Sequence, residues 1–222
     1  MSSADTTPTP SAVFAGRYEL LSLLGEGGMG RVYRARDREL GEVIALKTVL
    51  PQRADPDGLE RFKDEVRLAR RITHPNVLRI YDLGVFEGTP YFTMEYLAGG
   101  SLRDRIDRGP IELSKALGYL KQIAEGLAAA HACGVVHRDL KPSNVMLGPN
   151  DRLALGDFGI ALREGVADRE TTGTPGYMAP EQEGGRETDA SADSVRLRRG
   201  GDGDAARVRA HPPGAAADLA LP

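Results

Sequence analysis

Residues 137–144 read HRDLKPSN, and residues 157–159 read DFG. Both follow, in chain order, a glycine-rich stretch, GEGGMGRV at residues 25–32, and the segment IALK at residues 44–47. The glycine pattern alone is a weak signal, but the four stretches in this order form a highly specific combination. They indicate that the chain carries a phosphate-binding hairpin followed by a loop rich in catalytic residue types.

The glycine-rich stretch has the pattern G-x-G-x-x-G-x-V, ending at Val32. Glycines lack side chains, so backbone N–H groups can closely approach phosphate oxygens. An ordinary hairpin turn and a dinucleotide-binding fold have similar patterns, but the latter requires a helix directly after the loop. Here VYRA follows Gly30, which is typical of a strand. The stretch therefore predicts a hairpin that covers a nucleotide.

Lys47 lies on a predicted strand, Val43 to Val49, where its close neighbours are apolar or small. Such a lysine needs a partner, and a carboxylate on the following predicted helix could supply it. A helix turns by about 100° per residue, so only one of Asp64 and Glu65 can face the sheet. We expect Glu65 to do so; the alternative is a solvated surface pair.

The combined motifs resemble the eukaryotic-like Ser/Thr protein kinases, especially the bacterial, Hanks-type members, over about Arg17 to Gln182. The resemblance implies ATP and Mg²⁺ or Mn²⁺ as cofactors and protein Ser/Thr hydroxyls as phosphate acceptors. It implies that Asp139 orients the substrate hydroxyl proton and that Asn144 and Asp157 hold the metal. Lys141 would neutralise the transferring phosphoryl group, and its position favours Ser/Thr over Tyr substrates. His137 would be a core histidine that packs under Phe158.

By the same resemblance, Asp139, Lys141, Lys47 and Glu65 are the catalytic residues. The residues expected to contact the nucleotide are Gly25, Glu26, Gly27, Gly28, Gly30, Val32, Ala45, Lys47, Glu95, Leu97, Asn144 and Asp157. Met94 is expected beside the adenine pocket or in the core. Thr171 and Thr172 lie in a stretch that resembles an activation segment, where a phosphate could pair with Arg138. This gives the hypothesis of autophosphorylation, with self-association of the chain.

The predicted fold is α+β with two lobes, a small antiparallel β lobe with one helix and an incomplete, mainly helical large lobe. We expect a disordered lead over 1–16, a small lobe over 17–96, a partial large lobe over 97–182 and a disordered tail over 183–222. A long helix is expected from an N-cap at Ser114 to His131.

The tail lacks aromatic residues, Lys, Ile and Met. It does not continue the family pattern after the APE motif, which predicts a chain truncated there by a shift of the reading frame after Asp193. The resemblance stops there, so three functions stay open: an active kinase, a nucleotide-binding pseudokinase and an inactive truncated fragment.

The composition places further bounds on function. The 29 basic and 32 acidic residues give a net charge of −3, which provides no net attraction to nucleic acid or anionic membranes. No apolar run approaches the roughly 18 residues of a membrane span, and the only cysteine, Cys133, cannot close an internal disulfide. We therefore expect a cytoplasmic protein with no nucleic-acid partner and no membrane segment.

Overall fold

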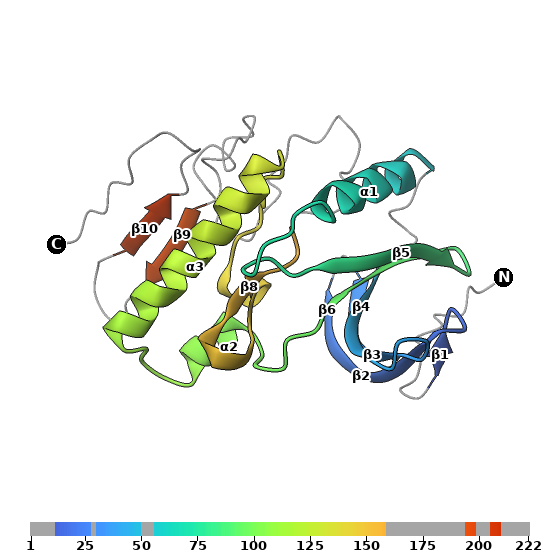
Figure 1. Cartoon of the computed structure of the whole chain (residues 1–222), viewed down its shortest axis with the longest axis horizontal. Coiled ribbons are helices and arrows are strands. Elements are labelled where there is room, and N and C mark those ends of the chain that lie inside the picture. The colour runs from blue at the N-terminus through green and yellow to red at the C-terminus, as the bar shows by residue number, and fades with distance from the viewer. Residues whose placement is uncertain (1–11, 28–29, 50–55, 159–193, 199–204, 210–222) are drawn as a thin grey trace. The chain divides into compact units, whose positions relative to one another are not determined.

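A six-stranded antiparallel sheet forms most of the first part of the chain, in the order β1-β2-β3-β4-β6-β5 (Figure 1). The computed structural model describes residues 12–27, 30–49, 56–158, 194–198 and 205–209. The sheet strands are β1 (Val13–Phe14), β2 (Tyr18–Gly27), β3 (Gly30–Asp37), β4 (Val43–Val49), β5 (Ile80–Phe86) and β6 (Thr89–Glu95). Helix α1 (Pro56–Ala69) packs on this sheet, with the Phe62 ring centroid 6.2 Å from that of Phe92.

The predicted strands and the predicted helix of this lobe are confirmed, with differences at their ends. Only Glu87 and Gly88 connect β5 to β6, and both have positive φ, as a type I′ two-residue turn requires. Part of the expected 1–16 lead belongs to the sheet, since Val13–Phe14 form β1. Phe14 is buried because its ring packs edge-on against Phe86 and Tyr91, each with a centroid distance of 5.0 Å.

The chain divides into two compact units, Met1–Val66 with Ile80–Tyr96, and Arg67–Arg79 with Leu97–Pro222. The second unit contains α2 (Leu102–Asp107), α3 (Leu113–Ala132), a 3-10 turn η2 (Pro142–Asn144), β7 (Val145–Leu147), a turn η3 (Pro149–Asp151) and β8 (Leu153–Leu155). Helix α3 supplies Tyr119, Ile123 and Leu127 to its core. The predicted α+β class is therefore confirmed for the described residues.

The ends of two helices depend on capping side chains. The N-cap of α3 is Glu112 rather than Ser114, because the Glu112 carboxylate accepts hydrogen bonds from the N–H groups of Ser114 and Lys115. Helix α2 was not predicted. Its signal is the capping box of Ser101 and Asp104, in which each side chain bonds to the other's backbone N–H.

The segment Arg67–Arg79 belongs to the second unit, although the sequence placed it with the small lobe. Asn76 accounts for this. Its buried carboxamide donates to the Leu153 carbonyl at 2.8 Å and to Gln122 Oε1 at 2.9 Å. Its own carbonyl accepts from the N–H of Leu155. The segment is therefore joined to β8 and α3 by hydrogen bonds to residues far along the chain.

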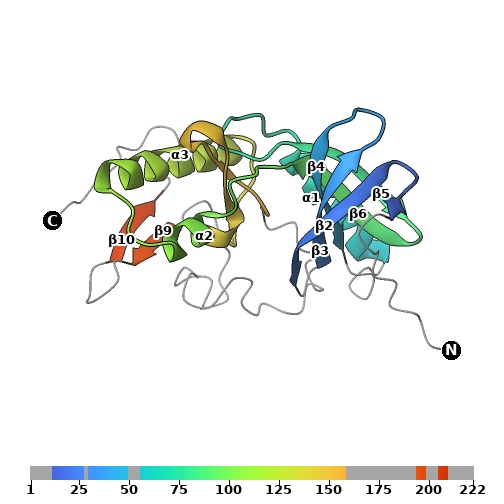
Figure 2. The ribbon, with the colours of Figure 1, turned by 90° about the horizontal axis from the view of Figure 1, so that it is seen from below.

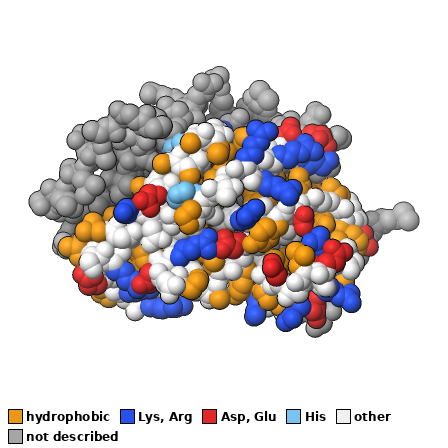
Figure 3. Space-filling view, in the orientation of Figure 1, with side chains coloured by type: hydrophobic (Ala, Val, Ile, Leu, Met, Phe, Trp, Pro, Cys, Tyr) orange, Lys and Arg blue, Asp and Glu red, His pale blue; other side chains and the backbone are white. Residues whose placement is uncertain are grey.

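Two further strands, β9 (Ser194–Arg198) and β10 (Ala205–Arg209), pair as an antiparallel hairpin (Figure 2). They lie inside the 183–222 stretch, for which the sequence predicted only disorder. Across the face in Figure 3, acidic and basic side chains of the described residues are interspersed. Among the described residues, no helix has the length and apolar character needed to cross a membrane.

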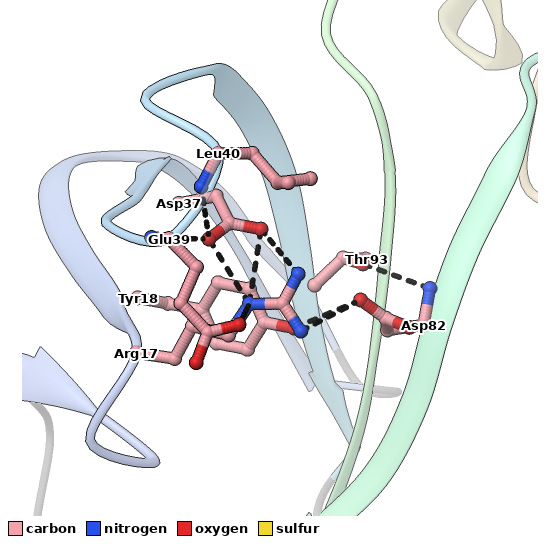
Figure 4. A network of polar contacts seen from close by, with 7 residues as sticks. All are labelled: Arg17, Tyr18, Asp37, Glu39, Leu40, Asp82 and Thr93. Atoms are coloured by element: carbon pink, nitrogen blue, oxygen red, sulfur yellow. Dashed lines mark hydrogen bonds and ion pairs between the residues drawn. The ribbon is translucent and has the colours of Figure 1, made fainter.

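An ion-pair network ties the start of β2 to the β3–β4 turn and to β5 (Figure 4). The Arg17 guanidinium donates to both carboxylate oxygens of buried Asp37, at 2.6 to 3.0 Å, and pairs with Asp82 at 3.3 Å. Asp37 also accepts from the backbone N–H groups of Glu39 and Leu40. Hydrogen bonding from Arg17 holds the pKa of the Asp37 carboxyl below its usual range.

The substitution Asp37→Asn tests this network. Hydrogen bonds to a charged group contribute about 1.5 to 3 kcal/mol, so the variant should lose that much unfolding free energy at pH 7. Because the folded-state pKa is lowered, this contribution is present above the unfolded pKa of about 4 and is lost as the pH falls. Urea melts should therefore show the gap between wild type and variant closing in acid.

The matched control is Glu39→Gln, since Glu39 is largely exposed and pairs with the same guanidinium at 3.3 Å. An exposed pair contributes at most about 1 kcal/mol, so this variant should melt close to wild type. A gap for Asp37→Asn that does not change with pH would contradict the assignment.

Candidate functional site

The glycine-rich hairpin is formed by the end of β2 and the start of β3. Gly27 pairs with Gly30, Glu26 with Arg31 and Gly25 with Val32. Gly28 lies outside the described residues. The predicted glycine hairpin is therefore present on the two strands where the sequence placed it.

Gly30 is required where it stands. Its φ is +139°, and a Cβ there would lie 1.8 Å from the backbone oxygen of Thr48 on β4. Only a residue without a side chain lets β3 pair with β4 at this point. The last glycine of the pattern therefore closes the hairpin onto the sheet.

Lys47 shares one face of the sheet with Val32 and Ala45, two of the residues predicted to contact a nucleotide. Val32 pairs directly with Lys47, and Ala45 pairs with Met94. Directly opposed residues lie on the same face, as do alternate residues along a strand. This face thus presents Val32, Ala45 and the half-buried Lys47 side by side.

Helix α1 lies over the same face. Lys47 pairs with Phe92, the residue on which Phe62 of α1 packs. Glu65 is one helical turn beyond Phe62 and is half-buried, whereas Asp64 is exposed. Glu65 thus lies on a more buried side of α1 than Asp64 does, and its pairing with Lys47 stays a prediction.

The residues expected around an adenine lie where the chain passes from one unit to the other. Glu95 ends β6, opposite Ile44, and Leu97 is the first residue of this part of the second unit. Met94 is buried. Met94 and Glu95 thus belong to the first unit and Leu97 to the second.

The HRDLKPSN loop is held together by Asn144. Its Nδ2 donates to the carbonyl oxygen of Asp139 at 2.8 Å and to the Asp139 carboxylate at 3.2 Å. The same carboxylate pairs with Lys141 Nζ at 2.7 Å, and both side chains are about one-fifth to one-quarter exposed. Three predicted residues are thus brought into direct contact, around one carboxylate that solvent can reach.

The DFG stretch is tied to this loop by backbone and ring contacts. The β7–β8 hairpin places the N–H of Gly156 2.9 Å from the Asn144 carbonyl. His137 is fully buried, its Nε2 lies 2.9 Å from the Gly156 carbonyl, and its ring centroid is 4.7 Å from that of Phe158. The prediction that His137 is a core residue packed on Phe158 is confirmed.

Two residues of these motifs adopt left-handed backbone conformations. Arg138 has φ +64° and Asp157 has φ +51°, which non-glycine residues rarely adopt. Such strain clusters at functional sites, where the surrounding structure holds it. Here the two strained residues precede Asp139 and follow Asn144 in the sequence.

The donor set suits a hard cation. Asn144 donates its amide nitrogen to Asp139, so its Oδ1 is the atom that could bind a metal together with the Asp157 carboxylate, as the sequence predicts. Among the described residues, no cluster of three His, Cys, Asp or Glu side chains could hold an ion. Mg²⁺ accepts such a set, since it is usually bound by one or two carboxylates with water and phosphate oxygens.

The described residues do not include the expected activation segment, so Thr171, Thr172 and the GTPGYMAPE stretch lie outside them. Sequence analysis did not single out Asn76 or Arg31. The signal for Asn76 is a lone amide between Pro75 and the apolar pair Val77 and Leu78. The signal for Arg31 is that it directly follows Gly30 while Glu26 directly precedes Gly27, so a hairpin that pairs these glycines also pairs the two charged residues.

Comparison with known proteins gives consistent results. The family pattern described as protein kinase domain matches residues 18–195. The chain is 41% identical over 202 residues to the DNA damage-responsive serine/threonine-protein kinase RqkA of Deinococcus radiodurans, which covers 85% of the chain and 30% of RqkA. It is 40% identical over 200 residues to the serine/threonine-protein kinase PknD of Mycobacterium tuberculosis, covering 87% of the chain and 30% of PknD.

The fold is also similar to a solved structure, the crystal structure of the PknI kinase domain of Mycobacterium tuberculosis. The TM-score is 0.67 at 33% identity, over 84% of this chain and 73% of that chain. The chain therefore spans about a third of the length of the two curated relatives and most of one kinase domain.

The substitution Gly30→Ala tests the role of this residue. The added Cβ would collide with the Thr48 carbonyl at a strained φ, so we expect a loss of about 1 to 3 kcal/mol in unfolding free energy. Denaturant melts would measure it. The control is Gly27→Ala, where the added atom meets no described atom within 4 Å and the change should stay below about 1 kcal/mol. Equal stability of the two variants would contradict the close approach.

Proposed function

We propose a function on one premise: the chain belongs to the protein kinase domain family, as a Ser/Thr kinase domain homologous to the bacterial Hanks-type kinases. The proposed activity is transfer of the ATP γ-phosphoryl group to Ser or Thr hydroxyls of protein substrates. The observation that carries the proposal is the contact of Asp139 with both Asn144 and Lys141.

In the proposed reaction, Asp139 orients the acceptor hydroxyl and takes up its proton. The hydrogen bond from Asn144 and the ion pair with Lys141 hold the Asp139 carboxylate in place. A positioned base of this kind contributes about 100- to 10,000-fold to the rate. Lys141 would move from Asp139 toward the transferring group as negative charge develops there.

The small unit would hold the nucleotide. Backbone N–H groups of the glycine hairpin and the Lys47 ammonium would bind the phosphates, while Glu65 orients Lys47. Magnesium-bound ATP supplies the phosphoryl group, and the ion offsets its negative charge. The Asn144 amide oxygen and the Asp157 carboxylate would hold that ion, with Mn²⁺ as a substitute.

Two substitutions separate binding from transfer. Asp157→Asn removes the metal carboxylate, so the rise in melting temperature caused by ATP and Mg²⁺ should disappear. Asp139→Asn keeps the backbone carbonyl to which Asn144 donates, so binding should persist. Transfer of labelled phosphate should fall at least about 100-fold in both variants.

The control is Asp107→Asn on the surface of α2, where a half-exposed carboxylate pairs locally with Arg103 at 2.9 Å. It should bind and transfer like wild type. If the wild-type protein binds ATP and Mg²⁺ without transferring phosphate, it is a pseudokinase. If it binds neither, the inactive-fragment alternative holds, and the proposed activity is wrong.

We further propose that the chain phosphorylates itself on Thr171 or Thr172, through association of two copies. The Arg138 side chain would bind the phosphate on that threonine, because a guanidinium binds phosphate in a bidentate manner. After incubation with ATP and Mg²⁺, mass spectrometry should find phosphate on one of these threonines in wild type and on neither in Asp139→Asn. An active protein with neither residue phosphorylated would reject this proposal.

A further inference from the structure

Glu26 and Arg31 form an ion pair across the glycine-rich hairpin. Arg31 Nε lies 3.0 Å from Glu26 Oε1, and the two residues are directly opposed in the strand register. The Arg31 side chain is only 15% exposed, so its guanidinium is held against the protein. Between this pair and the turn stands only the Gly27–Gly30 pair, which has no side chains.

The ion pair lies on the opposite face of the sheet from Lys47. Arg31 is adjacent to Val32, and neighbouring residues of a strand point to opposite faces. Val32 shares its face with Lys47, whereas Arg31 pairs with Thr48 and shares its face with Tyr33 of the core. The register therefore places Glu26, expected from the sequence to contact the nucleotide, behind the nucleotide-facing surface.

The charge of Arg31 acts on the core side of the hairpin. Burial raises the pKa of the Tyr33 hydroxyl, and the nearby Arg31 guanidinium opposes that rise. Arg31 is also anchored through its backbone, since its carbonyl accepts from Thr48 Oγ1 at 3.4 Å. The guanidinium thus interacts with both Glu26 and the Tyr33 hydroxyl.

This position has two physical consequences. Glycine has more conformational freedom than any other residue, so the last side-chain pair before the glycines limits how far the two strands separate. Arg31 also neutralises a carboxylate that would otherwise stand near the bound phosphates and repel them.

We propose that Glu26 and Arg31 are positioning residues, whose ion pair on the reverse face holds the glycine hairpin closed and electrically neutral and so raises its affinity for a nucleoside triphosphate. Neither side chain contacts the phosphates. This inference rests on the proposed function, because it concerns the same nucleotide site.

The experiment compares Glu26→Gln, Arg31→Gln and the exchanged double variant Glu26→Arg with Arg31→Glu, after thermal melting has shown that each folds. A matched control exists on the same two strands. Glu19 and Arg36 are also directly opposed, with Arg36 Nε 4.0 Å from Glu19 Oε2, far from the glycines. The control variants are Glu19→Gln and Arg36→Gln.

The first readout needs no nucleotide. Amide hydrogen exchange over residues 25–32 should be about two- to fivefold faster in both single variants of the Glu26–Arg31 pair, the range expected for loss of a cross-strand charge pair. It should return to the wild-type rate in the exchanged variant and stay unchanged in the controls. Equal exchange in all proteins would overturn the proposal.

The second readout is the dissociation constant for Mg²⁺-ATP and for AMP, measured by calorimetry. Arg31→Gln should weaken ATP binding about two- to fivefold and leave AMP binding unchanged, since AMP lacks the phosphates near the hairpin. The exchanged variant should restore ATP affinity. If it restores slow exchange but not ATP affinity, Arg31 contacts the phosphates directly and the proposal is wrong.

The two failures can be told apart. A wild-type protein that binds no nucleotide would overturn the proposed function, while the exchange rates would still decide whether the pair holds the hairpin. A wild-type protein that binds ATP, with single variants equal to wild type in both readouts, would overturn this inference alone.

Discussion

The hydrogen bonds of the Asn144 carboxamide to Asp139 are the interaction on which the proposed catalytic centre depends. They tie the two ends of the HRDLKPSN loop, so that one carboxylate is held with its ammonium partner Lys141 beside it. The backbone of Asn144 also accepts from Gly156, which fixes where the DFG stretch starts. One buried residue thus relates the proposed base to the aspartate proposed to hold the metal.

Burial makes this arrangement stiff. Asn144 is 8% exposed and donates to Asp139 within its own loop, and His137 is fully buried and hydrogen-bonded with the Gly156 carbonyl beside the DFG stretch. A buried polar group that loses its partner costs about 1 to 3 kcal/mol, so the loop has few alternative arrangements of comparable free energy. The left-handed conformations of Arg138 and Asp157 are consistent with this, since backbone strain persists only where its surroundings hold it.

The first unit also depends on contacts of a few polar and glycine residues, here at the glycine hairpin. Its glycine hairpin, in the proposed function, must be open to phosphates on one face and still belong to a sheet. Gly30 allows the close approach to Thr48, and Arg31 anchors the opposite face. Farther along the same strands, Arg17 joins three elements through Asp37 and Asp82. Charged side chains thus hold the sheet at both ends of the β2–β3 pair.

Much of this could be predicted from the sequence because the signals are local. Glycine spacing, a strand lysine, helical periodicity and the HRDLKPSN and DFG stretches each lie within a few residues, and their order indicated the kinase fold and the family. Local patterns also located β4, predicted and observed over Val43–Val49. The burial of His137 against Phe158 could be inferred because both belong to recognised motifs.

What only the tertiary structure decided are contacts between residues distant in sequence. Phe14 is ordered because Phe86 and Tyr91 cover it, and the segment around Asn76 joins the second unit because its partners, Gln122 and Leu153, come much later in the chain. The face of the sheet on which Glu26 lies follows from the strand register, because a shift of one residue would move its side chain to the other face. No local pattern contains that information, because it arises only when the strands pair.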